Sequence, residues 1–171
     1  MCLDIEKLQI RAIRKEDNSA IAQVIKSTLE EYGENKEGTV YTDPTTNLIY
    51  ESFHDVPKSQ YFIAEYKSEV IGGSGIYPTI GLPDKYAELV KIYLKPEFRG
   101  KGIGKLLYQK AEEFARKNGY SHLYLESFPS LKEAIHLYEK LGYRYMPKAL
   151  GNSGHFACTV WMLKELKDDG R

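Results

Sequence analysis

A glycine-rich turn between an apolar run and an amphipathic segment constrains the fold of this chain more than any other feature. The turn reads Arg-Gly-Lys-Gly-Ile-Gly over residues 99–104. The β-prone run Val90–Leu94 precedes it, and Pro96 ends this run because proline cannot donate to a strand ladder. After the turn, apolar residues at helical spacing predict one buried helix face: Ile103, Leu106, Leu107, Ala111, Phe114 and Ala115.

This helix is expected to end at Asn118-Gly119, where glycine can adopt the left-handed conformation that closes many helices. The next apolar run, His122–Leu125, predicts a second strand. The stretch Glu88–Ser127 is therefore predicted to form a strand, a loop, a helix and a further strand.

The turn predicts a binding site for a diphosphate. Alternate glycines leave amides uncovered at a helix N-terminus, and Arg99, Lys101 and Lys105 add positive charge. Two familiar phosphate motifs do not fit. Leu106 stands where a Walker A loop needs serine or threonine, and Lys105 stands where the dinucleotide fingerprint needs glycine. Glu126 lies near the position of a ribose-binding acid, so dinucleotide binding stays open, as does a solvated loop.

A third pattern fits, Arg/Gln-x-x-Gly-x-Gly/Ala, and it is met by Arg99, Gly102 and Gly104. With Glu88 upstream and Tyr-Glu-Lys-Leu-Gly-Tyr at 138–143, the chain resembles the GNAT superfamily of N-acetyltransferases over nearly its whole length. The resemblance implies an α/β (α+β) fold, with helices on both faces of a mixed, mostly antiparallel sheet of six to seven strands. The expected order is β-α-(α)-β-β-β-α-β-α-β-β.

The same resemblance implies acetyl-CoA as co-substrate, without a metal. The turn would bind the pyrophosphate, and a bulge in the fourth strand would free backbone amides for pantetheine and the thioester carbonyl. The chain departs from many relatives at Leu131, where they carry an asparagine that contacts the cofactor. The residues expected to bind the cofactor are Ile92, Tyr93, Leu94, Arg99, Gly100, Lys101, Gly102, Ile103, Gly104 and Lys105.

Acetyl transfer to an amine needs a base for the ammonium proton and an acid for the departing thiolate. Glu88 is the candidate base, because its spacing from the turn is that of the catalytic glutamate in histone-acetylating relatives. Tyr138 is the candidate acid, because it matches the tyrosine that the family places near the CoA sulfur. Each has a structural alternative: Glu88 as a surface carboxylate at a strand start, and Tyr138 as a core aromatic on the apolar face of its helix.

Outside this stretch, Gly72, Gly73 and Gly75 should weaken their strand unless another backbone or a ligand must come close. His155, in Gly151–His155, is either an acceptor contact or part of a turn that enters a strand. The remaining elements are expected as strands over Leu8–Arg14, Tyr61–Tyr66, Val70–Tyr77, Tyr143–Met146 and Phe156–Leu163, and helices over residues 19–32, Thr46–Phe53 and residues 130–141.

Composition narrows the class of protein. The 171 residues suit one N-acetyltransferase domain, residues 1–171, and equal counts of 24 basic and 24 acidic residues predict neither nucleic-acid nor membrane binding. Cys2 and Cys158 are too few for a disulfide framework, which indicates a reducing compartment. The protein is expected to be soluble and cytoplasmic, and to be a monomer or a homodimer.

The predicted activity is direct acetyl transfer to a small-molecule amine. Acetylation of a protein lysine or N-terminus, and a non-catalytic CoA-binding module, remain alternatives.

Overall fold

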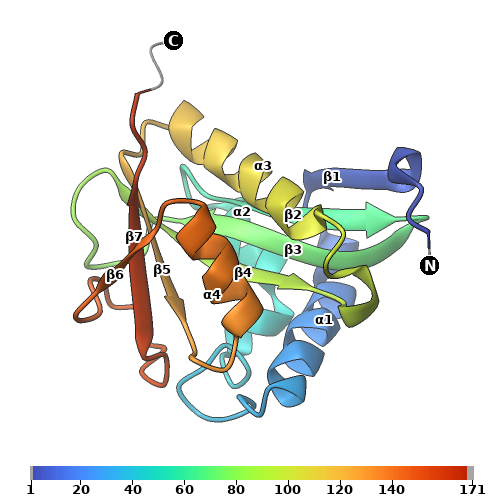
Figure 1. The fold of residues 1–171 in the computed structure, drawn as a ribbon, viewed down its shortest axis with the longest axis horizontal. Coiled ribbons are helices and arrows are strands. Elements are labelled where there is room, and N and C mark those ends of the chain that lie inside the picture. The colour runs from blue at the N-terminus through green and yellow to red at the C-terminus, as the bar shows by residue number, and fades with distance from the viewer. Residues whose placement is uncertain (1, 169–171) are drawn as a thin grey trace.

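The computed structural model describes residues 2–168. Helices and strands follow one another in the predicted order, and Figure 1 traces them from the blue N-terminal to the red C-terminal end. In chain order the elements are β1 (Leu8–Ala12), α1 (Asn18–Glu31), α2 (Ile49–His54), β2 (Gln60–Tyr66), β3 (Glu69–Tyr77), β4 (Tyr86–Leu94), α3 (Ile103–Lys117), β5 (His122–Ser127), α4 (Lys132–Lys140), β6 (Arg144–Met146) and β7 (Val160–Glu165).

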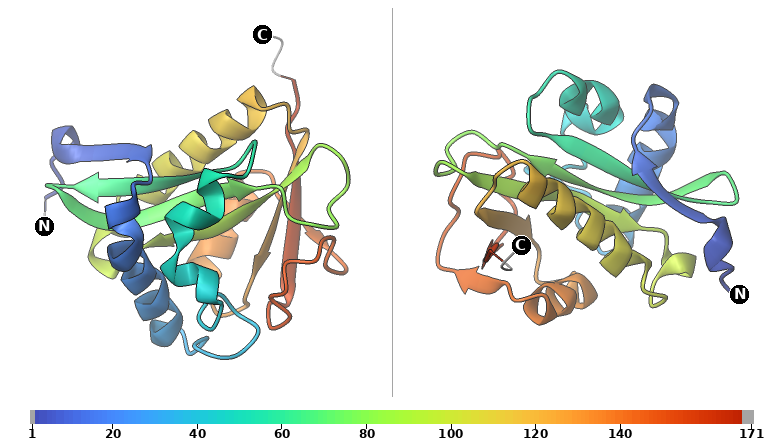
Figure 2. Two further views of the ribbon diagram at one scale, coloured as in Figure 1. Left: turned by 180° about the vertical axis from the view of Figure 1, so that it is seen from behind. Right: turned by 90° about the horizontal axis from the view of Figure 1, so that it is seen from above.

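The strands form one seven-stranded mixed sheet in the order β1-β2-β3-β4-β5-β7-β6. Each neighbouring pair is antiparallel except β4 and β5, which run parallel and are joined through α3. Helices α1 and α2 cover one face of the sheet, and α3 and α4 cover the other, as the right-hand view of Figure 2 shows. This arrangement confirms the predicted fold.

The two parallel strands separate soon after they begin. Tyr86, Ala87 and Glu88 pair with the first residues of β5, and within residues 2–168 no further pair joins β4 to β5. The sheet therefore has a gap in its middle, between the C-terminal halves of these two strands (Figure 1).

A bulge in β4 adds to this irregularity. Tyr93 lies opposite Gly73 of β3, whereas Val90 lies opposite Gly75, so β4 contains one residue more than β3 in this interval. Lys91, within the bulge, has a φ of 51°, in the left-handed region. The bulge that the family resemblance implied is therefore present in the fourth strand.

The glycines of β3 make room for a buried tyrosine of β2. A Cβ on Gly73 would lie 2.5 Å from a ring carbon of Tyr61, and a Cβ on Gly75 would lie 2.7 Å from another. The Tyr61 ring is fully buried, and its hydroxyl donates a hydrogen bond of 2.7 Å to the carbonyl of Lys91. At Gly73 and Gly75 the nearest neighbour is thus a side chain rather than the backbone or ligand that was expected. A Cβ on Gly72, in contrast, would meet the backbone oxygen of Tyr93.

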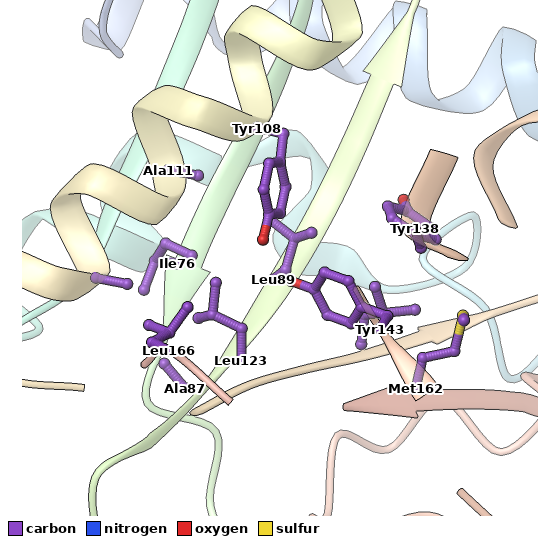
Figure 3. Packing of buried hydrophobic residues seen from close by; sticks show 12 residues of the cluster. Ile76, Ala87, Leu89, Tyr108, Ala111, Leu123, Tyr138, Tyr143, Met162 and Leu166 are labelled. Atoms are coloured by element: carbon purple, nitrogen blue, oxygen red, sulfur yellow. The ribbon is translucent and has the colours of Figure 1, made fainter. Parts of the chain in front are cut away.

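Tyrosines connect α3 and α4 on their side of the sheet. Tyr143 lies between Tyr108 of α3 and Tyr138 of α4, with ring centroids 6.0 and 5.8 Å apart (Figure 3). Buried residues from β4 and β5, among them Leu89 and Leu123, complete this core. This packing holds α4 beside the gap between β4 and β5.

Two predicted boundaries near the N-terminal half are wrong. The expected helix over Thr46–Phe53 is a 3₁₀ turn, Pro44–Asn47, followed by α2. Strand β1 also ends before Arg14, because the Arg14 amide donates a hydrogen bond of 2.7 Å to the Asp17 carboxylate rather than to a neighbouring strand.

The last strand also begins later than predicted. The expected strand over Phe156–Leu163 is observed as β7, which starts at Val160. The Phe156 ring packs against Gly38, and the amide of Ala157 donates a hydrogen bond of 3.0 Å to the Gly38 carbonyl. These contacts hold the segment before β7 against the loop after α1 instead of within the sheet.

Candidate active site

A cleft of about 570 Å³ opens where β4 and β5 separate. Most of the residues expected to bind the cofactor contribute to its wall: Ile92, Tyr93, Leu94, Arg99, Gly100, Gly102, Gly104 and Lys105. Two do not. Lys101 is exposed outside the cleft, and the Ile103 side chain is fully buried in the core beneath the turn.

The glycine-rich turn presents free backbone amides to this cleft. Gly100 and Gly102 have φ values of 72° and 83°, a region that only glycine adopts readily. Within residues 2–168, the amides of residues 100–105 donate to no other backbone group, and the first bond of α3 runs from Leu106 to Gly102 at 3.2 Å. A Cβ at either glycine would meet no atom within 4 Å. The turn therefore offers open donors at a helix N-terminus, which suits an anion.

The Arg99 side chain has a structural task. Its Nε donates a hydrogen bond of 2.9 Å to the Leu94 carbonyl, and its Nη1 forms an ion pair of 2.9 Å with Glu31 of α1. The guanidinium thus ties the turn to the end of β4 and to α1. Lys105, in contrast, is an exposed cation on the wall of the cleft.

The end of β4 also supplies amides to the gap. The Lys95 amide donates to a β3 carbonyl at 2.8 Å. Because hydrogen-bonding groups alternate sides along an antiparallel strand, the amide of Tyr93 also faces β3. The amides of Ile92 and Leu94 therefore face the gap, so two of the three residues that the resemblance indicated direct their amides there.

Glu88 lies at the point where the strands part. Its side chain is 4 % exposed, and its Oε2 accepts a hydrogen bond of 2.5 Å from the Thr79 hydroxyl. Burial raises the pKa of Glu88 to about 7, helped by the nearby charge of Glu126 and opposed by the Thr79 hydrogen bond and by Lys91. A carboxyl with a pKa near neutrality can accept and release a proton under ordinary conditions.

A smaller cavity of about 50 Å³ adjoins the cleft beside Glu88. The cleft and the cavity share wall residues, among them Lys91, Tyr93 and Glu126. His155 and Cys158, from the segment before β7, complete the far side of the cavity. A group bound in the cleft can therefore meet a second molecule bound in the cavity.

Glu126 of β5 is a second, half-buried acid at this junction. Its Oε2 accepts a hydrogen bond of 2.7 Å from Tyr124, and its Oε1 accepts one from the Ser153 hydroxyl. Tyr124 lies opposite Glu88 in the parallel pair, and alternation along β5 places Glu126 on the same face. This alternation was the available signal, but from the sequence Glu126 was considered only as the ribose contact of the dinucleotide alternative.

His155 reaches the cavity from a loop. Its Nε2 lies 3.0 Å from an Asp43 carboxylate oxygen, and its amide donates a hydrogen bond of 3.1 Å to the Ser153 hydroxyl. The segment is irregular, as its Gly-Asn and Ser-Gly dipeptides indicate, and its histidine also lines the cavity. Asp43 carries no sequence signal, because it lies in a loop without hydrophobic periodicity.

Tyr138 lies both in the core and at the wall of the cleft, so its position is compatible with a core aromatic and with an acid. Its side chain is 4 % exposed and packs on Tyr143, and it also contributes to the wall of the cleft. Burial raises the pKa of Tyr138 above its ordinary value, so the phenol keeps its proton at neutral pH. Leu131, the residue that departs from the family pattern, lines both the cleft and the cavity.

Cys158 is a poor nucleophile in this setting. Burial raises the pKa of its thiol to about 12, so the reactive thiolate is scarce at neutral pH. Among residues 2–168, no group of three or more His, Cys, Asp or Glu side chains could hold a metal ion. In the same part of the chain, no helix combines the length and the apolar character needed to cross a membrane.

The mixed seven-stranded sheet and its bulged fourth strand are those that the family resemblance implied. The chain belongs to the acetyltransferase (GNAT) family, whose model matches residues 22–143. It is 42% identical over 158 residues to the N-acetyltransferase YjgM of Escherichia coli, an alignment that covers 92% of this chain and 94% of that relative.

Solved structures agree with the fold. An acetyltransferase of the GNAT family from Staphylococcus aureus superposes with a TM-score of 0.77 at 18% identity, covering 94% of this chain and 99% of that one. A GNAT phosphinothricin acetyltransferase from Sinorhizobium meliloti, solved in complex with acetyl-CoA, superposes with a TM-score of 0.72 at 23% identity, covering 93% and 88%.

Proposed function

We propose that this acetyltransferase moves the acetyl group of acetyl-CoA directly to the primary amine of a small molecule, within a ternary complex. One observation carries the proposal. A cleft with free amides at a helix start meets a small cavity that contains Glu88, a carboxyl with a pKa of about 7.

The cleft would hold the cofactor by its backbone. The amides of residues 100–105 would bind the pyrophosphate, with Lys105 adding positive charge. The amides of Ile92 and Leu94 would bind pantetheine and the thioester carbonyl, whose oxygen gains negative charge as the amine attacks. Donors held in place by the strand need little reorganisation during the reaction.

Proton transfer would divide between two buried residues. An amine that arrives as an ammonium gives a proton to Glu88, and its free electron pair then attacks the thioester carbonyl. A C–N bond forms and the C–S bond breaks, and Tyr138 gives its proton to the departing thiolate. The nitrogen releases its second proton to solvent as the amide forms. Glu88 ends protonated and Tyr138 deprotonated, and exchange with solvent restores both.

Direct transfer is favoured over a covalent acetyl-enzyme. Cys158 is the thiol nearest to this chemistry, but its pKa of about 12 keeps it protonated. The cavity next to Glu88 is also small, about 50 Å³, which favours a compact acceptor over a protein segment.

The test has two parts. Thermal shift should respond to acetyl-CoA and CoA but not to NAD, and thiol release should then appear with some members of a panel of amines, amino acids and peptides. Intersecting initial-velocity lines would support the ternary complex, whereas parallel lines would indicate a covalent intermediate. Equal stabilisation by NAD would refute the cofactor assignment, and a shift by acetyl-CoA without thiol release would indicate a binding module.

A further inference from the structure

The proposed mechanism gives Lys91 no role, although this residue lies between the cofactor cleft and the smaller cavity. The residue occupies the bulge of β4 with a φ of 51° and lines both the cleft and the smaller cavity. The hydroxyl of Tyr61 holds its carbonyl at 2.7 Å. The backbone of Lys91 is therefore fixed where the cofactor cleft meets the cavity.

The acids around Lys91 are already engaged elsewhere. The carboxylates of Asp43, Glu88 and Glu126 are each hydrogen-bonded to another side chain. None of the ion pairs formed within residues 2–168 includes Lys91. The cavity thus contains a cation without a direct partner beside acids that have one.

The surroundings of this cation leave it poorly solvated. Removal from water lowers the pKa of the Lys91 ammonium, while the charges of Asp43 and Glu88 act in the opposite direction and favour its charged form. A charged group that is withdrawn from water is costly unless it is paired. An anionic group on a bound molecule would supply the missing partner.

We propose that the acceptor is an amine of the amino-acid type, whose carboxylate pairs with Lys91 while its amino group meets Glu88; this rests on the proposed function. Glu88 and Lys91 both belong to β4, and the bulge at Lys91 interrupts the alternation that would otherwise place residues three positions apart on opposite faces. Both line the same cavity of about 50 Å³. The amine and the carboxylate of the acceptor must therefore be separated by only a few bonds.

The same arrangement disfavours the other acceptors. A polyamine would bring a second ammonium against Lys91, and like charges repel. The side chain of a lysine in a protein has no carboxylate close to its amine. A carboxylate-bearing small molecule is the acceptor that satisfies both Glu88 and Lys91.

Matched pairs of acceptors provide the test. Each L-amino acid is compared with the amine that lacks its α-carboxylate, such as alanine with ethylamine and serine with ethanolamine, because the cavity has room only for a small acceptor. Spermidine and a lysine-containing peptide represent the other classes. Thiol release gives kcat/KM for the wild type, Lys91→Met, Lys91→Arg and the control Lys110→Met, which changes an exposed lysine of α3.

The wild type should prefer the carboxylate-bearing member of its best pair. Lys91→Met should lower kcat/KM for that member by about 10- to 100-fold, the usual effect of losing a hydrogen bond to a charged group, and leave the other member nearly unchanged. The Lys91→Arg variant should retain most of the wild-type preference for the carboxylate-bearing acceptor, and Lys110→Met should retain all of it.

Three results would overturn this inference. The first is a preference for spermidine, the peptide or the decarboxylated amines, and the second is no turnover with any amino acid. The third is an equal loss of kcat/KM for both members of a pair in Lys91→Met, which would show that Lys91 only adjusts Glu88. The proposed function is judged separately. It stands if acetyl-CoA shifts the melting temperature and any small-molecule primary amine is acetylated.

Discussion

Glu88 is poised between two protonation states at neutral pH, because burial raises its pKa to about 7. An ionised carboxylate is needed to accept the ammonium proton. The value of kcat/KM should therefore rise with pH around pH 7, where Glu88 loses its proton, and then level off. At higher pH, deprotonation of the acceptor's ammonium group in solution becomes the main effect.

Glu88→Gln removes this titration with little change in shape. We expect kcat/KM to fall by about 10²–10⁴-fold, the usual contribution of a general base, and the rise near pH 7 to disappear. The measurement is a pH–rate profile of thiol release, with Glu16→Gln as control because Glu16 is exposed. A Glu88→Gln profile that coincides with the wild type would assign proton removal to solvent or to another residue.

Tyr138→Phe separates acid catalysis from packing. The ring contacts with Tyr143 are retained, so the melting temperature and acetyl-CoA affinity should hardly change, while turnover falls about tenfold or more. The loss should be smaller with an acetyl donor whose thiol is more acidic, since a better leaving group needs less protonation. Tyr145→Phe, which changes a tyrosine that is 57% exposed, is the control. Full activity in Tyr138→Phe would leave only the core role.

At the scale of the elements, the first turn of α3 begins the helix and leaves the amides of residues 100–105 without backbone acceptors among residues 2–168. Gly104 is the second residue of α3, and a Cβ there would lie 4.0 Å from the Leu137 side chain, an ordinary contact. A side chain at this position is therefore compatible with the fold. A negative charge there favours the helix itself but opposes a bound phosphate.

Gly104→Asp should keep or raise the melting temperature of the free protein and abolish its shift with acetyl-CoA. Gly104→Ala should retain most of the shift and gain up to about 1 kcal/mol of stability from the better helix former. Thermal denaturation with and without acetyl-CoA provides both readings. A full shift in Gly104→Asp would mean that the pyrophosphate binds elsewhere.

Periodic elements were predictable, and loops were not. The apolar face of α3 and the runs of β4 and β5 repeat at helix or strand spacing, so the central unit could be located from residues alone, whereas Glu88 was singled out by the family resemblance. Asp43 and His155 meet across 112 positions of sequence, in segments held by single contacts such as Phe156 on Gly38. Such contacts produce no periodic pattern in the amino-acid sequence. The start of β7 was misjudged for the same reason.

For the whole molecule, the raised pKa of Glu88 links activity to stability. The ordinary pKa of 4.5 describes the unfolded chain, and the value of about 7 describes the folded one. Between these values the folded protein keeps a proton that the unfolded chain has lost, so the contribution of Glu88 falls as pH rises. Above pH 7 its ionisation is a penalty on folding, by linkage up to roughly 3 kcal/mol.

Glu88→Gln should therefore be more stable than the wild type at pH 8, and this advantage should shrink as the pH falls toward 4. Urea unfolding at several pH values measures the difference, and Glu16→Gln again provides the baseline. If Glu88→Gln is the less stable protein at pH 8, the charged carboxylate stabilises the fold and the assigned direction of its pKa is wrong.

The gap between β4 and β5 also bears on aggregation. Unpaired strand edges invite strands of other proteins, and here the outermost strands, β1 and β6, carry that hazard. The gap has unpaired backbone groups as well, but they lie between two strands of the same sheet, with α3 and α4 beside them. A slender ligand can use these groups, whereas a partner strand with side chains on both faces has no room to approach. The enzyme thus has unpaired strand edges at a position where they cannot pair with a second copy of the chain.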